Sequence, residues 1–431
     1  MNEQLSKKLV PELRFKRDNG TDYPEWEIVK LSTISKRQTL KNKDENISRV
    51  LTNSATEGIL DQRDYFDKDI ANKSNLSNYF IVDKEDYVYN PRISSKAPVG
   101  PISKNKIGKG VMSPLYTVFR FNSQNNSFYE CFFNSSKWHR YLQEISNIGA
   151  RHDRMNITND QFMNMPVPKV DPEEQKKVAE CLSLIDELIN LNIKKLEILN
   201  KYKKGFIQSL FPCENNCIPE IRFPTFRNNS QWVKSRMGQY IEILSGYPFK
   251  STDISTDSKG IPLIRGINIT EGKIRHNINI DRYYLGSINK LDKYKVKKND
   301  LVIGMDGSKV GKNVALISEE DENSLLVQRV ARLRSKSITD IQFIFHHVNS
   351  KKFHLYVDRM NTSGGIPHIS AKQIQDFEIF FPKDTQEKEK LNQFFFQLDE
   401  IISSQIAKLE KLELHKIALS QKLFPNLYEV N

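Results

Sequence analysis

Residues 171–212 read DPEEQKKVAECLSLIDELINLNIKKLEILNKYKKGFIQSLFP, and residues 384–425 read DTQEKEKLNQFFFQLDEIISSQIAKLEKLELHKIALSQKLFP. The two stretches align end to end without a gap and are identical at 16 of 42 positions. Self-similarity at a fixed spacing is the signature of an internal repeat. The fold therefore contains the same element twice.

Both copies are predicted to be long helices. Asp171 and Asp384 are N-cap candidates, with Glu174 and Glu387 three residues on as in a capping box, and both copies end at a Leu-Phe-Pro where proline cannot continue the helix. At 1.5 Å per residue, roughly 38 residues give a rod of about 57 Å. Apolar residues recur in both copies with steps of three and four, which places them on one face. We predict that the helices pair antiparallel through this face, formed by Leu182, Ile185, Ile189, Ile193, Leu196 and Leu199 in the first copy and Phe395, Leu398, Ile402, Ile406, Leu409 and Leu412 in the second.

A second repeat precedes each block. Pro11-Glu12-Leu13-Arg14-Phe15 returns as Pro219-Glu220-Ile221-Arg222-Phe223, and each is followed by a tryptophan, Trp26 or Trp232. Between these anchors the halves share little. The sequence thus predicts an α+β protein in which two mixed α/β domains are separated by two long antiparallel coiled-coil helices, with a pseudo-two-fold duplication. The predicted segments are residues 1–168 (first domain), 169–212 (central helix), 213–382 (second domain) and 383–431 (C-terminal helix).

Each variable segment mixes predicted strands and helices. Residues rich in β-formers lie between turn residues, and two shorter helical stretches follow them. The predicted strands are 86–89, 115–121, 300–303 and 327–333, and the predicted helices are about 130–145 and 341–361.

The composition narrows the class of protein. The 431 residues carry a formal charge of +12 with a pI near 9.2, and the mean hydropathy is −0.57. No stretch approaches the roughly 18 apolar residues of a membrane span, and the N-terminus has no apolar core of a signal peptide. We therefore expect a cytoplasmic protein with no membrane partner. The basic balance is explained equally well by an anionic partner such as nucleic acid or by AT-rich coding, which favours Lys and Asn.

Motifs for catalysis are incomplete. The loop 307–313 has three residues between its glycines, where a phosphate-binding loop needs four, and Asn313 replaces the hydroxyl residue, so we interpret it as a loop between strands. Asn90-Pro91-Arg92 lacks the second proline and the aromatic residue of an amino-methylation box. Four cysteines form no zinc-ligand pattern, and neither His152 nor His368 has an accompanying nucleophile. We predict no catalytic residue and no metal site.

Basic, amide and aromatic side chains are interleaved in the variable segments. Residues 84–154 hold 11 basic and 5 acidic side chains, and residues 290–336 hold 11 and 7. Arg suits guanine edges, Asn and Gln suit adenine edges, and Lys and Ser or Thr suit phosphates. For any single residue, an ordinary solvated surface remains the more common explanation. The predicted DNA contacts are Asn90, Arg92, Lys96, Arg151 and Arg154 in the first domain, and Arg265, Asn268, Lys309, Lys312, Thr362, Ser363 and His368 in the second.

With these motifs in place, the chain resembles the DNA-specificity subunit of type I restriction-modification systems. The order of variable domain and long helix ending in Leu-Phe-Pro, twice over, carries the resemblance across essentially the whole chain. Residues 219–224 leading to Trp232, residues 172–175, 262–269 and 328–334 are also similar to that family. The second helix departs from the family in opening with Thr385 where the first has Pro172.

The resemblance implies a non-catalytic, sequence-specific DNA-binding subunit. Each target-recognition domain would read one half of a bipartite double-stranded site, and the helices would set the spacer. Two modification subunits that methylate adenine at N6 would dock on the helices, and two restriction subunits would complete an endonuclease. The resemblance implies that this chain binds no cofactor, and that S-adenosylmethionine, ATP and Mg²⁺ are bound by the partner subunits.

Two other classes stay open from the sequence. A single-chain enzyme would show methylation or cleavage by the isolated chain, which the incomplete motifs disfavour. A scaffold or RNA-binding adaptor would not prefer split duplex DNA over RNA. The sequence reveals neither the bases that are read nor the spacer length.

Overall fold

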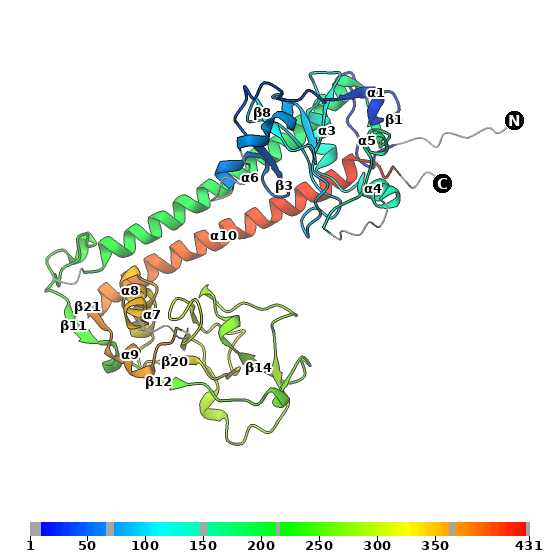
Figure 1. Cartoon of the computed structure of the whole chain (residues 1–431). Coiled ribbons are helices and arrows are strands. Elements are labelled where there is room, and N and C mark those ends of the chain that lie inside the picture. Colours follow the sequence, from blue (N-terminus) through cyan, green and yellow to red (C-terminus); the bar gives the residue numbers. More distant parts are fainter. Residues whose placement is uncertain (1–9, 66–72, 147–152, 213–215, 362–366, 428–431) are drawn as a thin grey trace. The chain divides into compact units, whose positions relative to one another are not determined.

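The computed structural model describes residues 10–65, 73–146, 153–212, 216–361 and 367–427. The chain divides into two compact units (Figure 1): unit one comprises residues 1–193 with 407–431, and unit two comprises residues 194–406. The long helices α6 (Pro172–Leu210) and α10 (Thr385–Leu423) both contain 39 residues, and each contributes one half to each unit. The predicted starts and ends of both helices are confirmed. The predicted division into four sequence segments stays a prediction.

Within each unit, the N-terminal half of one long helix packs against the C-terminal half of the other. In unit one, Val178 and Leu182 of α6 share a hydrophobic core with Leu423 of α10. In unit two, Ile207 of α6 shares a core with Phe395 of α10. The start of each long helix therefore contacts the end of the other, so the two helices run antiparallel. None of the twelve predicted pairing residues is exposed: Leu182, Ile189, Phe395 and Ile402 are buried, and the other eight are half-buried.

Two ion pairs repeat this arrangement. Asp186 of α6 pairs with Lys416 of α10 in unit one, and Asp399 of α10 pairs with Lys203 of α6 in unit two. The gapless alignment of the two helical stretches places Asp186 opposite Asp399 and Lys203 opposite Lys416. The two pairs are thus the same contact made twice, from residues that are identical in the two copies.

Unit one contains short strands and helices around an aromatic core. Tyr87, Phe119, Phe128, Phe132 and Trp138 are fully buried there, and aromatic side chains bury the most apolar area per residue. Its elements are β1 (Glu27–Lys30), α1 (Leu31–Ile34), β2 (Ser35–Arg37), β3 (Leu51–Ser54), β4 (Gly58–Asp61), α2 (Gln62–Tyr65), η1 (Lys73–Asn78), β5 (Phe80–Val82), β6 (Tyr87–Tyr89), β7 (Ile102–Lys104), β8 (Gly110–Met112), β9 (Thr117–Phe121), α3 (Ser127–Phe133), α4 (His139–Ile145), α5 (Asn159–Met163) and β10 (Pro166–Lys169).

Unit two has the larger sheets. Helix α7 contacts β18 and also packs on α10, so it lies between the sheet and the long helix (Figure 1). Its elements are η2 (Pro224–Phe226), β11 (Val233–Arg236), η3 (Met237–Gln239), β12 (Glu242–Ser245), η4 (Ser251–Asp253), β13 (Ile254–Ser255), β14 (Ile261–Ile264), η5 (Gly266–Asn268), β15 (Glu271–Gly272), β16 (Tyr283–Tyr284), η6 (Asp292–Tyr294), β17 (Leu301–Gly304), β18 (Val314–Leu316), β19 (Leu325–Leu326), β20 (Val330–Arg334), α7 (Ile338–Val348), α8 (Lys351–Met360), α9 (Ala371–Asp376) and β21 (Glu378–Phe381).

The two units repeat one sheet topology that the sequence does not reveal. Strand order β2-β9-β6-β7 in unit one matches β12-β20-β17-β18 in unit two, and the pair β1-β10 matches β11-β21. The register matches as well, because Tyr87 pairs with Phe119 and Leu301 pairs with Leu333. The duplication therefore includes the variable domains, where few side chains are shared.

A buried ion pair connects each domain to the start of its long helix. In unit one, Arg14 donates two hydrogen bonds to Glu174, at 2.8 and 2.9 Å, and the indole of Trp26 donates a third at 2.9 Å. In unit two, Arg222 donates to Glu387 at 2.6 and 2.7 Å, and Trp232 donates at 3.3 Å. We call these the Arg–Glu–Trp clusters. They explain the repeated Pro-Glu-Leu/Ile-Arg-Phe motif and the tryptophan that follows it.

Helix capping differs from the prediction in one respect. Asp171 and Asp384 cap the helices as expected, because their carboxylates accept from the backbone N–H groups of Glu173 and Gln386 at 2.9 and 2.8 Å. The glutamates three residues on bind the arginines of the Arg–Glu–Trp clusters. They were predicted as reciprocal capping residues, and that part was wrong because a buried arginine is the stronger partner for a carboxylate.

Three predicted elements are interrupted. The predicted helix 130–145 is divided into α3 and α4, and the predicted helix 341–361 into α7 and α8, where Ser350 caps the second helix by accepting from Phe353 N at 3.3 Å. The predicted strand 327–333 begins only at Val330, because a turn at Gln328 and Arg329 separates β19 from β20. The loop 307–313 connects the antiparallel strands β17 and β18, as predicted.

Candidate nucleic-acid interface

The loop that follows the central strand of each domain is bound to the segment that leads to the exit strand. In unit one, Arg92 and Arg154 form an isolated antiparallel bridge, and in unit two Asp306 and His368 form one. Flanking hydrogen bonds are equivalent: Ile93 N donates to Asp153 O and Met155 N to Pro91 O, while Gly307 N donates to Pro367 O and Ile369 N to Met305 O. We call this feature the loop junction. One and the same offset along the chain places Arg92 opposite Asp306 and Arg154 opposite His368.

The loop junction brings several of the predicted contacts of unit one together. Arg92 and Lys96 are exposed, and neither side chain forms a hydrogen bond or ion pair with a described residue. Arg154 lies at the bridge with its side chain 25% exposed, 3.7 Å from Asp153, and its Nε is buried without a hydrogen-bond partner among the described residues. Arg151 lies outside the described residues.

Asn90 holds this loop together from inside. Its side chain is buried, donates to the carbonyl oxygen of Asn53 at 2.9 Å and accepts from the backbone N–H of Arg92 at 3.1 Å. An amide with both ends engaged is not available to an adenine edge. Its DNA contact stays a prediction, but the structure gives it the role of fixing the position of Arg92.

In unit two the loop junction gathers His368 and the loop that carries Lys309 and Lys312. His368 is exposed, and its backbone N–H donates to Asn361 Oδ1 at 2.6 Å. Lys309 is exposed and lies 3.9 Å from Glu271, whereas Lys312 pairs with Asp358 at 2.9 Å. Thr362 and Ser363 lie outside the described residues.

Arg265 and Asn268 belong to a different loop, after β14. Asn268 is buried and donates to Asp281 at 3.1 Å. The guanidinium of Arg265 donates to the carbonyl oxygen of Ile280, and burial together with the nearby Arg282 lowers its pKa. Their contact with DNA stays a prediction, and the structure does not bring them into the loop junction.

Gln328 and Arg329 form a turn at the loop junction that the sequence analysis missed as a site. Arg329 has a φ of 68°, and its guanidinium donates to Asp306 at 3.0 Å. No sequence pattern marked this turn, because the residues 327–333 look like one strand. Arg332 lies in the same stretch, so Arg329 did not stand out among the β-formers.

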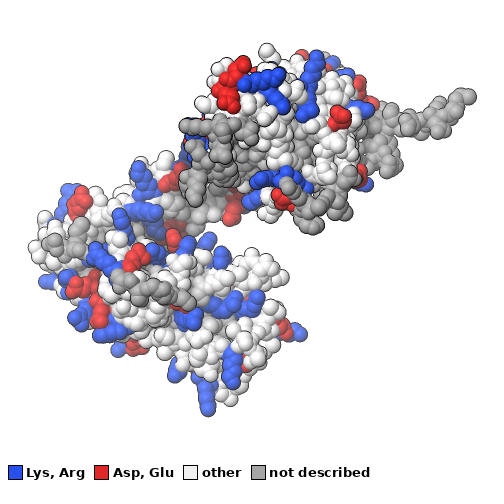
Figure 2. Space-filling view, viewed as in Figure 1, with Lys and Arg blue, Asp and Glu red and all other residues white. Residues whose placement is uncertain are grey.

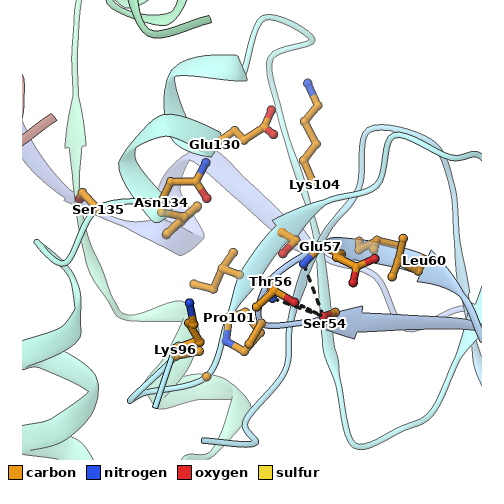
Figure 3. Close-up of a pocket in the computed structure, with 18 of the residues that line it drawn as sticks. Ser54, Thr56, Glu57, Leu60, Lys96, Pro101, Lys104, Glu130, Asn134 and Ser135 are labelled. Atoms are coloured by element: carbon orange, nitrogen blue, oxygen red, sulfur yellow. Dashed lines mark hydrogen bonds between the residues drawn. The ribbon is translucent and has the colours of Figure 1, made fainter. Parts of the chain in front are cut away.

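A half-open cavity of about 600 Å³ lies beside the loop junction of unit one. Figure 3 shows Ser54, at the end of β3, and Thr56 and Glu57, from the turn that follows it, across the cavity from α3 and the next residue, Asn134. Two lysines of the cavity wall are paired with acidic residues, Lys104 with Glu85 and Lys106 with Glu130. The cavity therefore has mixed and largely balanced charge, with Lys96 contributing an exposed cation.

Basic side chains are frequent on unit two, where Figure 2 shows more Lys and Arg than Asp and Glu on the visible face. Among the described residues, no group of three or more His, Cys, Asp or Glu is placed to hold a metal ion. Burial raises the pKa of the Cys131 thiol to about 12, which keeps it unreactive at neutral pH. No helix in the described part of the chain is long and apolar enough to cross a membrane.

Comparison with known proteins supports a DNA-reading role. Residues 229–414 match the family described as the type I restriction modification DNA specificity domain. The chain is 25% identical over 418 residues to the type I restriction enzyme MjaVIII specificity subunit of Methanocaldococcus jannaschii, which covers 94% of this chain and 93% of that protein. The second half of the chain therefore carries a type I restriction modification DNA specificity domain, and the chain as a whole is similar to specificity subunits of such systems. The chain is also 30% identical to the EcoAI specificity subunit of Escherichia coli, over 176 residues that cover 40% of this chain and 28% of that protein.

Solved structures show the same fold. The chain resembles one from a study of type I restriction-modification complex assembly, with a TM-score of 0.60, 14% identity and coverage of 94% and 99% of the two chains. It resembles the specificity subunit of M. genitalium with a TM-score of 0.57, 14% identity and coverage of 97% and 100%. The α+β fold with paired long helices, predicted from the sequence, is therefore confirmed.

Proposed function

We propose that this chain is the specificity subunit of a type I restriction-modification complex and reads two separated parts of one DNA duplex, one with each domain. The observation that carries the proposal is the duplicated loop junction. The same backbone hydrogen bonds recur in both units, yet the bridged residues are Arg92 and Arg154 in one and Asp306 and His368 in the other. A shared framework with different side chains is what reading two different half-sites requires.

The experiment that tests this function is a map of methylated bases in a genome, with and without the chain. We expect modification at one split, asymmetric sequence that disappears when the chain is removed. Because the proposal assigns no chemistry to this chain, the isolated chain should neither methylate nor cleave DNA. A modified sequence without a gap, or one that persists without the chain, would contradict the proposal.

We further propose that α6 and α10 set the distance between the half-sites. Each helix has 39 residues, which corresponds to about 58 Å at 1.5 Å per residue. Continuous hydrogen bonding makes a helix stiff along its axis, so its length can determine a spacing on DNA.

Inserting four residues after Lys194 should lengthen the preferred spacer and leave both half-sites unchanged. Four helical residues add about 6 Å, close to the rise of two base pairs. The measurement is the modified sequence in the methylation map. A matched control replaces the exposed Lys194 and Glu197 with alanine at constant length, and its spacer should stay the same. An unaltered spacer in the insertion variant would rule out the helices as the ruler.

Partner docking is the third part of the proposal. Large apolar side chains remain exposed on the long helices, and contiguous exposed apolar surface marks protein interaction sites. They are Leu184, Leu188, Leu191, Leu414 and Ile417 in unit one, and Ile198, Tyr202, Phe206 and Ile401 in unit two. We propose that they bind two modification subunits, which would hold S-adenosylmethionine and methylate adenine at N6. Restriction subunits that use ATP and Mg²⁺ would complete the complex.

Replacing both Leu184 and Leu191 with lysine should remove the modification subunit bound at unit one. Both side chains are more than half exposed, at 64% and 55%, and burying each leucine at an interface stabilises it by about 1.5–3 kcal/mol. Mass measurement of the complex should show one modification subunit where the native chain binds two. The matched control, Ser183→Lys with Asn190→Lys, changes exposed polar residues of the same helix and should bind both copies. Equal assembly of the two variants would argue against this docking face.

A further inference from the structure

The turn between β19 and β20 adopts a conformation that its residues do not favour. Arg329 has a φ of 68°, in the left-handed region that costs a non-glycine residue about 1–2 kcal/mol. Such residues persist where the surrounding structure determines the backbone, and they cluster at functional positions. The turn is the point at which the predicted strand 327–333 is interrupted.

Two neighbouring segments, at residues 246–247 and at Met305, fix this backbone. Gln328 N donates to Tyr247 O at 2.9 Å, Tyr247 N donates to Leu326 O at 2.8 Å, and Met305 N donates to Arg329 O at 2.8 Å. Gly246 lies so close that an added Cβ would stand 2.2 Å from the carbonyl oxygen of Val327. The turn is therefore held by backbone contacts, which leave its side chains free of any packing role.

Both side chains of the turn are exposed beside the loop junction. Arg329 is 66% exposed and donates to Asp306, whose own backbone bridges His368. Gln328 is exposed, and its amide has no hydrogen bond with a described residue. An exposed ion pair is weak, so Asp306 can orient the guanidinium without preventing it from binding another acceptor.

We propose that Gln328 and Arg329 read base edges in the half-site contacted by the second domain, an inference that rests on the proposed function. Arginine pairs with O6 and N7 of guanine, and glutamine pairs with N6 and N7 of adenine. The turn presents both groups in adjacent positions from a fixed backbone. Arg329 is the guanine reader, oriented by Asp306, and Gln328 reads the neighbouring base.

The first domain cannot use the same pair. The offset that relates the two loop junctions places Gln328 and Arg329 opposite Pro114 and Leu115, which have no hydrogen-bonding side chain. Its guanidinium groups come from Arg92 and Arg154 instead. The two domains thus share one backbone framework but place arginine at the loop junction from different segments. We expect this difference to give each domain a different base preference.

The test is selection from a randomised duplex DNA library by the full-length chain assembled with its modification subunits. The native chain should select two conserved blocks separated by a gap. Arg329→Ala should lower the discrimination at one base position by about 10–100-fold and leave the other block unchanged. Arg329→Gly should do the same while relieving the left-handed backbone, so a loss shared by both variants is not a folding defect. Gln328→Ala should relax a position next to the one that Arg329 reads.

Lys298→Ala is the matched control, since Lys298 is an exposed cation of the same domain, paired with Glu319. Its selected sequence should equal that of the native chain. Unchanged selection by Arg329→Ala would overturn the proposal, and so would a uniform loss of affinity for all sequences, which indicates a phosphate contact. A native chain that selects no split sequence would instead overturn the proposed function on which the inference rests.

Discussion

Replacing Glu387 with alanine should lower the free energy of unfolding of unit two by about 3–5 kcal/mol. Glu387 is 1% exposed and accepts two hydrogen bonds from Arg222 and one from Trp232. Arg222 is itself 8% exposed. Removing the carboxylate leaves a buried guanidinium without its counter-charge, and this is more costly than the loss of the hydrogen bonds alone.

Hydrogen exchange of amides in the first turns of α10, combined with denaturant unfolding, measures this effect. Glu387→Gln should give a smaller loss, because an amide still accepts a hydrogen bond but carries no charge. Glu319→Ala is the matched control: its carboxylate pairs with Lys298 at the surface, so the stability of unit two should stay the same. Equal stability of Glu387→Ala and Glu319→Ala would show that the Arg–Glu–Trp cluster does not hold the helix to the domain.

The sequence contained the outline of this cluster but not its geometry. The repeated motif with Arg14 and Arg222, the tryptophans and the helix starts were all visible as patterns. Which partner the glutamate would choose depended on the approach of residues that are far away in the chain. Local rules predicted a reciprocal cap, and the distant arginine displaced it.

The pairing of the long helices was predictable for a different reason. Its signal is periodic and it occurs twice, so both the apolar face and the partner could be identified from the chain itself. The ion pairs of Asp186 with Lys416 and of Asp399 with Lys203 follow from residues that the two copies share. Because the two helical stretches can be aligned with each other, residues that are far apart in the chain can be identified as partners by comparing the two copies.

The candidate DNA contacts were less accessible to sequence reasoning. Composition identified Asn90 and Asn268 as amides near basic residues, but both are buried and bind backbone or a carboxylate. Conversely, Arg329 was hidden inside an apparent strand, because a left-handed turn at an arginine has no propensity signal. The loop junction is duplicated only in its backbone, so no alignment of side chains reveals it.

Acid should destabilise unit two through two histidines at the interface of α7. Burial lowers the pKa of His346 and of His347 to about 3, and the nearby Lys203 and Lys352 act in the same direction. In the unfolded chain a histidine has a pKa of about 6.5. As the pH falls, the unfolded chain therefore binds protons before the folded chain does. The contribution of the neutral histidines to the free energy of unfolding is fully present above about pH 6.5 and is lost as the pH falls toward 3. Each histidine should contribute a loss on the order of 2 kcal/mol between pH 7 and pH 5.

His346 offers a clean test, because its Nε2 is buried without a hydrogen-bond partner among the described residues and its ring packs against Phe395 and Phe396. His346→Phe removes the titrating group and keeps an aromatic ring, so the variant should match or exceed the native stability at pH 7. The decrease in the free energy of unfolding between pH 7 and pH 5 should be about half as large in this variant, because His347 is also buried and still contributes its own share. Denaturant unfolding at the two pH values measures the difference. An unchanged pH dependence in His346→Phe would mean that acid acts on unit two through other groups, since the only titration removed is that of the buried imidazole.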